Sequence, residues 1–266
     1  MTSRTSKSGK QVAETSAEKG PLAGKTVLVT GGGLRVGKAI AWALGMAGAR
    51  VAVHHNRSRA EAERLVAKMH QHDIEAETFA ADLSDAAAPT SLMSRVRLWA
   101  KHLDILVNSA AVFDRRAFES VPIEALDLHW ALNFRAPFLL SQQAAPLLRE
   151  RKGVMVNVLD VAAFSAWKGY SHYCPTKAAL AMFTRCLAVE LAPDVRVCGV
   201  APGTVMFPDD YDPGAQGEVV SKIPLGRVGK PEDVAEAVLY LATAPYVTGA
   251  VLPVDGGRLA GSRGQL

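Results

Sequence analysis

Short apolar runs alternate with longer amphipathic stretches along most of this chain. Runs rich in valine, leucine and alanine lie at residues 25–30, 50–54, 75–80, 105–108, 154–159, 195–200 and 250–254. Between them, apolar residues recur at helical offsets in residues 36–48, 58–72, 122–151, 172–191 and 231–242. Strands that are buried on both faces and joined by crossover helices produce this alternation. The pattern therefore predicts an α/β protein, a doubly wound Rossmann fold with a seven-stranded parallel sheet flanked by helices.

The same pattern predicts a single domain over residues 22–266. The chain has 266 residues and shows neither an internal repeat nor a mid-chain linker, and open α/β sheets of this length often form one unit. Residues 1–21 are rich in Ser, Thr, Lys and Glu, so they are predicted to form a disordered tail. Residues 204–228 contain repeated Pro and Gly that break the alternation, which predicts an irregular substrate loop that acts as a lid.

Composition and charge narrow the range of partners. The net charge of +4 comes from Lys and Arg spread along the chain without a basic run, which favours a small-molecule substrate over a nucleic acid. No apolar run approaches the ~20 residues that cross a bilayer, so no membrane partner is expected. The three cysteines, Cys174, Cys186 and Cys198, are too widely spaced for a CxxC metal site and odd in number for a disulfide framework. We therefore expect a cytoplasmic protein without a metal site.

A glycine-rich turn follows the first predicted strand. It runs from Thr30 to Gly37 and offers Gly31, Arg35, Val36 and Gly37 as candidate cofactor contacts. Glycines let a backbone turn tightly and approach a pyrophosphate, whose charge is favoured at the positive end of the following helix. Such turns also join strands and helices without any ligand, but the position after the first strand favours a dinucleotide site.

The end of the second predicted strand favours NADP(H) over NAD. An NAD site usually has an acidic residue there to bind the ribose hydroxyls, whereas this chain continues with His55, Asn56, Arg57 and Ser58. Arg57 and Ser58 can bind a 2'-phosphate, and Arg35 approaches from the glycine turn. The alternative is that Arg57 only caps a solvated helix start.

Asp82 and Leu83 follow the third predicted strand, where the adenine ring lies at the edge of such a site. Both are candidate cofactor contacts. Asp82 can equally cap a helix, because Ser84 and Asp85 stand beside it.

Tyr173 and Lys177 form the predicted reaction centre. They are four residues apart in a predicted helix, so both side chains leave the same face. A nearby ammonium favours the ionised form of a phenol, which brings a group with a free pKa of about 10 closer to acid or base use near neutrality. Tyr-x-x-x-Lys is common in ordinary helices, but together with the glycine turn it is a specific signal.

Through these motifs, residues 22–257 resemble the short-chain dehydrogenase/reductase family. The resemblance implies a proton relay through Asn133, Lys177 and Tyr173, although Asn133 alone could be an ordinary polar group of a helix. It also implies cofactor contacts after the fourth and sixth strands. These contacts are Asn108, Ser109, Ala110, Pro202, Gly203 and Thr204.

Two departures from the common family pattern resemble the pteridine reductase branch. Arg35 stands where the turn usually has another glycine, and Asp160 stands where the family has a serine that binds the substrate carbonyl. Phe113 matches an aromatic residue that stacks on the pterin ring in that branch. The resemblance implies NADPH-dependent reduction of a dihydropterin, dihydrobiopterin or dihydrofolate, with Tyr173 as proton donor and Phe113, Asp160 and Tyr173 around the substrate. The alternatives are a helix cap for Asp160 and a core position for Phe113.

Two other functions stay open from the sequence. One is a short-chain carbonyl or 3-oxoacyl reductase in which Ser165 or Ser171 binds the substrate instead of the missing serine. The other is a non-catalytic NADP-binding sensor, which the presence of Tyr173, Lys177 and Asn133 disfavours.

The family resemblance also implies a homotetramer. In the pteridine reductase branch the C-terminal end of a neighbouring subunit approaches the active site, and Arg258 and Arg263 are the candidates for that role here.

Overall fold

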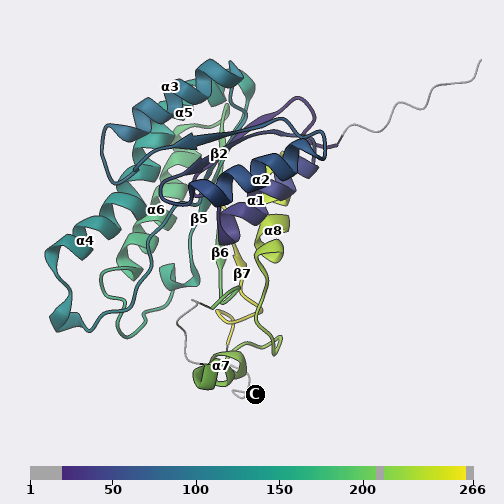
Figure 1. Cartoon of the computed structure of the whole chain (residues 1–266). Helices are drawn as coiled ribbons and strands as arrows, with labels where there is room; N and C mark the ends of the chain where they lie inside the picture. The colour runs from purple at the N-terminus through teal and green to yellow at the C-terminus, as the bar shows by residue number, and fades with distance from the viewer. Residues whose placement is uncertain (1–19, 208–212, 262–266) are drawn as a thin grey trace, which may run out of the picture.

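Seven parallel strands form one sheet at the centre of the molecule (Figure 1). The computed structural model describes residues 20–207 and 213–261. The strand order is β3-β2-β1-β4-β5-β6-β7, and every neighbouring pair is parallel, which confirms the predicted doubly wound fold. The strands are β1 (Thr26–Val29), β2 (Arg50–His55), β3 (Ala76–Ala80), β4 (Ile105–Asn108), β5 (Val154–Val158), β6 (Arg196–Pro202) and β7 (Val251–Val254).

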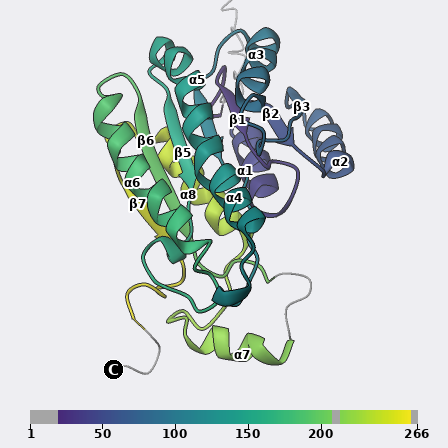
Figure 2. The ribbon, with the colours of Figure 1, turned by 90° about the vertical axis from the view of Figure 1, so that its left-hand side faces the viewer.

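Helices cover both faces of the sheet because successive strand side chains point to opposite sides. In β1, Val27 and Val29 face one core and Leu28 faces the other. Figure 2 shows α5 and α6 on the near side of the strands and α8 behind them. The first core packs against α1 (Arg35–Met46), α2 (Arg59–His70) and α8 (Pro231–Thr243), and the second against α3 (Ala88–Ala100), α5 (Ala136–Arg151) and the end of α6 (Cys174–Glu190).

The structure corrects two of the predicted segments. The helix expected over residues 122–151 consists of α4 (Ile123–Trp130), a turn of π-helix (Ala131–Arg135) and α5. Residues 204–228 are not wholly irregular, because α7 (Pro213–Ser221) forms within them. The tail predicted over residues 1–21 lies outside the described residues except for its last two positions.

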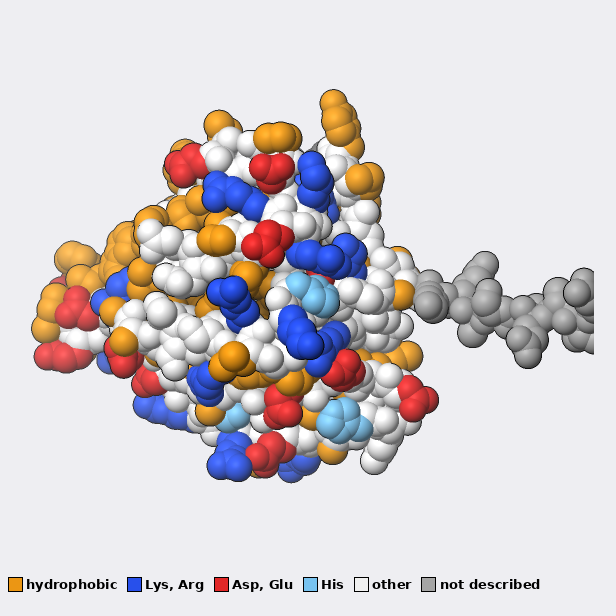
Figure 3. Space-filling view, turned by 90° about the horizontal axis from the view of Figure 1, so that it is seen from above, with side chains coloured by type: hydrophobic (Ala, Val, Ile, Leu, Met, Phe, Trp, Pro, Cys, Tyr) orange, Lys and Arg blue, Asp and Glu red, His pale blue; other side chains and the backbone are white. Residues whose placement is uncertain are grey.

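The site-bearing loops gather at the carboxyl ends of the strands. The strand order reverses between β1 and β4, and ligands of open α/β sheets bind at such a switch point. Figures 1 and 2 both place α7 beyond the carboxyl ends of β6 and β7, at the foot of the molecule. In the described part of the chain, no helix has the length and apolar character needed to cross a membrane. Figure 3 shows one face on which basic and acidic side chains intermingle without a continuous basic patch.

Candidate active site

The glycine turn between β1 and α1 is packed too closely for side chains at two positions. Gly31 has φ +63°, and a Cβ there would lie 3.0 Å from the Cα of Ala110. A Cβ on Gly37 would overlap the carbonyl oxygen of Gly31. The turn therefore approaches the end of β4 closely and presents backbone rather than side chains beside the first turn of α1, the geometry that a pyrophosphate needs.

Two side chains that the sequence analysis did not single out as site residues hold this turn in place. The Thr30 hydroxyl oxygen accepts hydrogen bonds from the backbone N–H groups of Ser109 (2.9 Å) and Ala110 (3.0 Å), which ties β1 to the segment after β4. His54 Nδ1 accepts from the Gly31 N–H at 3.1 Å, and its Nε2 lies 3.1 Å from the Ala81 carbonyl oxygen. Burial lowers the pKa of His54 to about 4. In the sequence, the available signal for these contacts was a polar residue near the end of each strand, Thr30 after β1 and His54 in β2.

The end of β2 carries the exposed residues that were predicted to bind the 2'-phosphate. Asn56 and Arg57 are exposed, and Ser58 is half-buried with its hydroxyl beside Gly33 of the turn. His55 differs from them, because its side chain is buried and its Nδ1 lies 3.2 Å from the Asn56 carbonyl oxygen. As predicted, no acidic side chain ends the strand itself.

Asp82 and Leu83 have separate environments. The Asp82 carboxylate accepts hydrogen bonds from the Ser84 N–H at 3.0 Å and the Ser84 hydroxyl at 2.7 Å. These are the local contacts expected if Asp82 acts as a cap. These hydrogen bonds lower the pKa of Asp82, and the nearby charge of Arg57 adds to the effect. Leu83 is buried in the second core, so only its backbone is available to a ligand.

Arg35 points toward the predicted substrate loop. Its Nη2 donates to the Phe207 carbonyl oxygen at 3.1 Å, and its Nε lies 3.2 Å from the Met206 sulfur. Arg35 also has a φ of +50°, in the left-handed region. Val36 is half-buried and packs against the first core.

Tyr173 and Asp160 form a direct pair at the predicted reaction centre. The Tyr173 hydroxyl donates to Asp160 Oδ2 at 2.9 Å, and Asp160 Oδ1 accepts from the Ala162 N–H at 2.8 Å. Asp160 therefore caps the short turn Val161–Ala163 with one oxygen and holds Tyr173 with the other. Asp160 therefore makes the contact of a helix cap, which was one expectation from the sequence, and also contacts Tyr173, the predicted proton donor.

Burial controls the ionisation of this centre. Tyr173 is 3% exposed, and desolvation together with the adjacent Asp160 charge raises its pKa well above the usual value. Desolvation also raises the pKa of Asp160 and lowers that of Lys177 to about 8. Burial and Asp160 therefore shift the pKa of Tyr173 in the direction opposite to the one expected from Lys177. The phenol stays protonated near neutrality, which suits a proton donor.

Two other residues of the predicted relay, Lys177 and Asn133, and the strand-end residue Asn108 make mainly structural contacts. Lys177 Nζ donates to the Val158 carbonyl oxygen at 3.0 Å. Asn133 bonds the backbone of Val112 through both of its amide atoms and Thr176 through Nδ2 at 3.2 Å, rather than Lys177 directly. Asn108 Nδ2 donates to Asn157 Oδ1 at 2.9 Å, which links β4 to β5.

Phe113 stands at the mouth of the site, 42% exposed, so the core alternative is wrong for it. Its ring stacks on Tyr170 at 5.0 Å and meets Tyr173 edge-on at 4.9 Å. Trp167 meets Tyr170 edge-on at 5.6 Å. The sequence analysis missed Trp167 and Tyr170, and their three-residue spacing before Tyr173 was the available signal.

C-terminal residues of the same chain pack against the segment after β6. A Cβ on Gly203, the residue after Pro202, would lie 2.8 Å from the Cα of Asp255. Arg258 Nη1 donates to the Thr204 hydroxyl at 3.1 Å, and its guanidinium lies 5.1 Å from the Trp167 ring centroid.

Arg258 therefore approaches the site from its own chain, whereas a neighbouring subunit was predicted to supply it. Arg263 lies outside the described residues.

The two serines proposed as substitutes for the missing serine are both exposed. The Ser165 hydroxyl lies 3.4 Å from the Val161 carbonyl oxygen and accepts from Trp167 Nε1 at 3.1 Å, so it is engaged within its own loop. Neither contact joins Ser165 to Tyr173.

Comparisons with known proteins identify the family to which this chain belongs. Residues 34–258 match the family model described as Enoyl-(Acyl carrier protein) reductase. The chain is 38% identical over 248 residues to L-xylulose reductase of Bos taurus, covering 90% of this chain and 98% of that protein. It is 35% identical over 251 residues to 2-(S)-hydroxypropyl-CoM dehydrogenase 3 of Xanthobacter autotrophicus, covering 90% of this chain and 98% of that protein.

Solved structures of related proteins have closely similar folds. A putative short-chain alcohol dehydrogenase from Sinorhizobium meliloti has a TM-score of 0.86 at 31% identity, covering 90% of this chain and 98% of that one. A blue fluorescent protein from a metagenomic library, solved in complex with NADPH, has a TM-score of 0.85 at 30% identity, covering 90% of this chain and 99% of that one.

The chain belongs to the short-chain dehydrogenase/reductase family, whose members are NAD(P)-dependent oxidoreductases. The relatives support this general class and do not support the pteridine reductase branch in particular.

Proposed function

We propose that this chain is an NADPH-dependent reductase of a small hydroxylated carbonyl compound. The observation that supports this most directly is the Tyr173–Asp160 pair, in which a protonated phenol and a hydrogen-bond acceptor stand side by side. Tyr173 donates its proton to the carbonyl oxygen, while Asp160 accepts a hydrogen bond from a hydroxyl on the neighbouring carbon. A ketose has both groups, which agrees with the similarity to L-xylulose reductase.

NADPH is the proposed cofactor because the residues present fit it. At Gly31 and Gly37 a Cβ would meet the backbone of Ala110 and of Gly31, so the turn stays tight and presents backbone beside the start of α1, as a pyrophosphate requires. Arg57 and Ser58 at the end of β2 would hold the 2'-phosphate, and Pro202, Gly203 and Thr204 would lie beside the nicotinamide. When bound, the cofactor supplies the hydride. The NADPH complex of the structural relative described above supports this assignment.

Replacing Arg57 with alanine is expected to raise the KM for NADPH by about 10–100-fold, because a hydrogen bond to a charged group contributes roughly 1.5–3 kcal/mol. Steady-state kinetics with NADPH and NADH measure this, and the KM for NADH should not change. Arg59→Ala is the matched control, since Arg59 is exposed two residues later and pairs with Glu63 at 2.7 Å. An equal rise for both cofactors would contradict the role of Arg57.

Each residue around the reacting bond has a separate role in the proposed reaction. Tyr173 stays protonated until substrate arrives because burial and Asp160 raise its pKa. The Lys177 ammonium, held 3.0 Å from the Val158 carbonyl oxygen, stabilises the phenolate that proton transfer leaves behind. The Asp160 carboxylate orients the substrate. Asn133 acts as a positioning residue, since its hydrogen bonds fix Val112 beside the site.

A second candidate substrate is a dihydropterin or dihydrofolate, and the aromatic mouth of the site favours it. Phe113 is half-exposed and suits stacking against a flat heterocycle. Asp160 would accept a hydrogen bond from a ring N–H or amino group beside the reduced C=N bond. Both candidates share the requirement for a hydrogen-bond donor next to the bond that is reduced.

A substrate pair separates these candidates. Wild-type protein is expected to reduce hydroxyacetone about 10–100-fold better than acetone in kcat/KM, because only the first offers a hydroxyl to the carboxylate. Asp160→Ser should remove this preference. NADPH oxidation at a single wavelength follows all the reactions. Equal rates on the two ketones would contradict the role of Asp160, and faster turnover of dihydrobiopterin than of hydroxyacetone and L-xylulose would favour the second candidate.

We also propose a homotetramer built through α5 and α6. Phe138 and Met182 on these helices are 42% and 56% exposed. The rings of Phe138 and Phe183 stack at 5.2 Å, with Phe134 beside them. Such an apolar patch on the described surface is suited to contact a second copy of the chain.

A further inference from the structure

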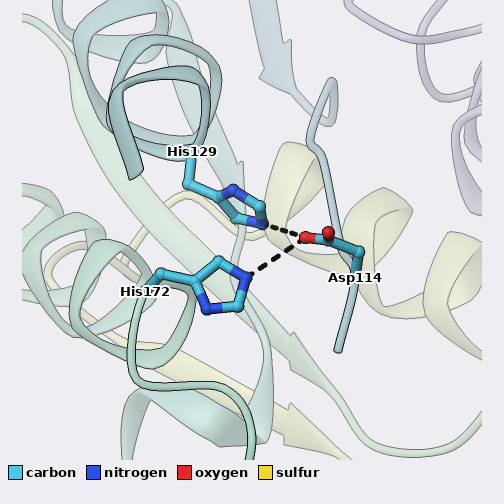
Figure 4. A group of neighbouring side chains, drawn as sticks. All are labelled: Asp114, His129 and His172. Carbon is cyan, nitrogen blue, oxygen red and sulfur yellow. Dashed lines mark hydrogen bonds and ion pairs between the residues drawn. The ribbon is translucent and has the colours of Figure 1, made fainter. Parts of the chain in front are cut away.

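Three side chains from separate parts of the chain meet beside the active site (Figure 4). Asp114 follows Phe113, His129 lies in α4, and His172 directly precedes Tyr173. Asp114 Oδ1 lies 3.0 Å from His129 Nε2 and 3.2 Å from His172 Nε2. Both imidazole side chains are 1% exposed, and the carboxylate is 34% exposed. The cluster is therefore buried on its histidine side and reachable from the Asp114 side.

The hydrogen bonding of His129 leaves a lone pair pointing at a carboxylate. His129 Nδ1 lies 2.7 Å from the Ala125 carbonyl oxygen, and a carbonyl only accepts, so Nδ1 bears the hydrogen. In the neutral ring Nε2 is then an acceptor that faces the acceptor Asp114 Oδ1. His129 Nε2 is buried and has no hydrogen-bond partner among the described residues. Two facing acceptors at this distance repel each other unless a cation lies between them.

A metal ion meets this requirement because it would bind the lone pair of His129 Nε2 and an oxygen of Asp114 at the same time. His172 Nε2 lies 3.2 Å from the same Asp114 oxygen, and the described residues provide no hydrogen-bond partner for His172 Nδ1. Without a metal, His172 Nε2–H donates to Asp114; with one, the ring hydrogen would sit on Nδ1 and Nε2 would present its lone pair to the ion. A ligand histidine that donates its other N–H to a backbone carbonyl is the usual arrangement around bound metals.

We propose that Asp114, His129 and His172 form a binding site for a divalent transition-metal ion such as Zn²⁺. Bonds of about 2.0–2.2 Å to nitrogen and oxygen place neighbouring tetrahedral ligands roughly 3.4 Å apart. The measured separations of 3.0 and 3.2 Å are close to this value, and all three ligand atoms lie within 4.8 Å of one another. Histidine nitrogen and carboxylate oxygen are ordinary zinc ligands.

Arg116 leaves one carboxylate oxygen for the ion. Arg116 Nε lies 2.6 Å from Asp114 Oδ2, so Oδ1 alone faces the two imidazoles. The positive charge of Arg116 reduces the affinity for a cation, and it also fixes the orientation of the carboxylate. We expect a one-oxygen ligand with a water completing the coordination.

The position of the site gives the ion a structural role. It joins the segment that holds Phe113 to α4 and to the turn before Tyr173, so binding orders both sides of the substrate mouth. The His129 ring centroid lies 6.3 Å from that of Tyr173, and in the described part of the chain Asp160 makes no hydrogen bond or ion pair with the cluster. The ion therefore positions these residues and does not touch the reacting atoms. The proposal is independent of the substrate proposed above.

Metal content and Co²⁺ spectroscopy test the site without any turnover. The full chain, freed of any purification tag, is stripped with a chelator and dialysed against Zn²⁺ or Co²⁺. We expect about one ion per chain and the intense visible bands of four-coordinate Co²⁺. Loss of a partner that only supports a metal ligand costs about 10–100-fold in affinity, so His129→Gln and His172→Gln should each cost more than about a hundredfold.

Matched variants keep the test decisive. His72→Gln is the control, since His72 is exposed in the turn after α2, is not part of the cluster and should leave full binding. Asp114→Asn preserves side-chain volume if a histidine variant does not fold, and circular dichroism checks folding of each variant. Less than a tenth of an ion per wild-type chain, or Co²⁺ bands unchanged in both histidine variants, would overturn the proposal.

Discussion

Replacing Tyr173 with phenylalanine is expected to lower kcat/KM for reduction by about 10²–10⁴-fold, the usual contribution of a positioned general acid. The ring and its contacts with Phe113 remain in this variant, and only the proton that passes to the substrate is lost. Water has poor access to replace it, since the Tyr173 side chain is 3% exposed. The loss should appear mainly in kcat, measured by NADPH oxidation, while the dissociation constant of NADPH stays unchanged.

The same substitution has a smaller cost in stability. Asp160 Oδ2 loses the donor that lies 2.9 Å away, and an unsatisfied buried acceptor costs about 1–3 kcal/mol. Thermal unfolding measures this loss. Tyr240→Phe is the matched control, because Tyr240 is 55% exposed on α8 and should keep both activity and stability. Retention of more than about a tenth of the activity in Tyr173→Phe would rule out the phenol as the proton donor assigned here.

Gly37→Ala is expected to be the most damaging single-methyl change in the cofactor site. The added Cβ would overlap the carbonyl oxygen of Gly31, and both partners are backbone that no rotamer change can move. Overpacking of this kind costs about 1–3 kcal/mol and sometimes more. The turn must open to accept the methyl group, so we expect a lower unfolding midpoint and loss of measurable NADPH binding by fluorescence titration.

Gly217→Ala provides the comparison for this prediction. Gly217 lies in α7, and a Cβ there would meet nothing within 4 Å. Alanine is favoured over glycine in a helix by about 1 kcal/mol, so this variant should be as stable as the wild type or more so. Wild-type NADPH affinity in Gly37→Ala would show that the turn is not the phosphate site.

The sequence predicted the sheet well because most of its strands are short apolar runs. Five of the seven predicted runs contain a strand of the structure, and the other two overlap β2 and β6, which extend one and two residues further. The central strands β1, β4 and β5 are buried throughout, so no polar alternation obscures their pattern. The helices were harder. The sequence analysis missed α3, in which Pro89, Thr90 and Ser91 directly follow the first residue, Ala88. It also missed α7, which lies among Pro213, Gly214 and Gly217.

The site was predictable where its residues are neighbours in sequence. Tyr173 directly precedes α6 and Lys177 lies in its first turn, and the glycine turn is one continuous segment. The contact between Asp160 and Tyr173 followed from the family resemblance, but its effect on the Tyr173 pKa depends on burial, which the sequence does not reveal. Asp114 and His172 are 58 positions apart, so no local spacing could indicate their meeting.

The neutral ring of His54 has a consequence for how the glycine turn responds to acidification. A free histidine gains a charge over the mildly acidic range, whereas burial holds the pKa of His54 near 4. The acceptor that fixes the Gly31 N–H therefore survives until the surroundings are far more acidic. Over the mildly acidic range the charge within the turn therefore stays constant, and the attraction for phosphate that we propose would come from arginines, which keep their charge.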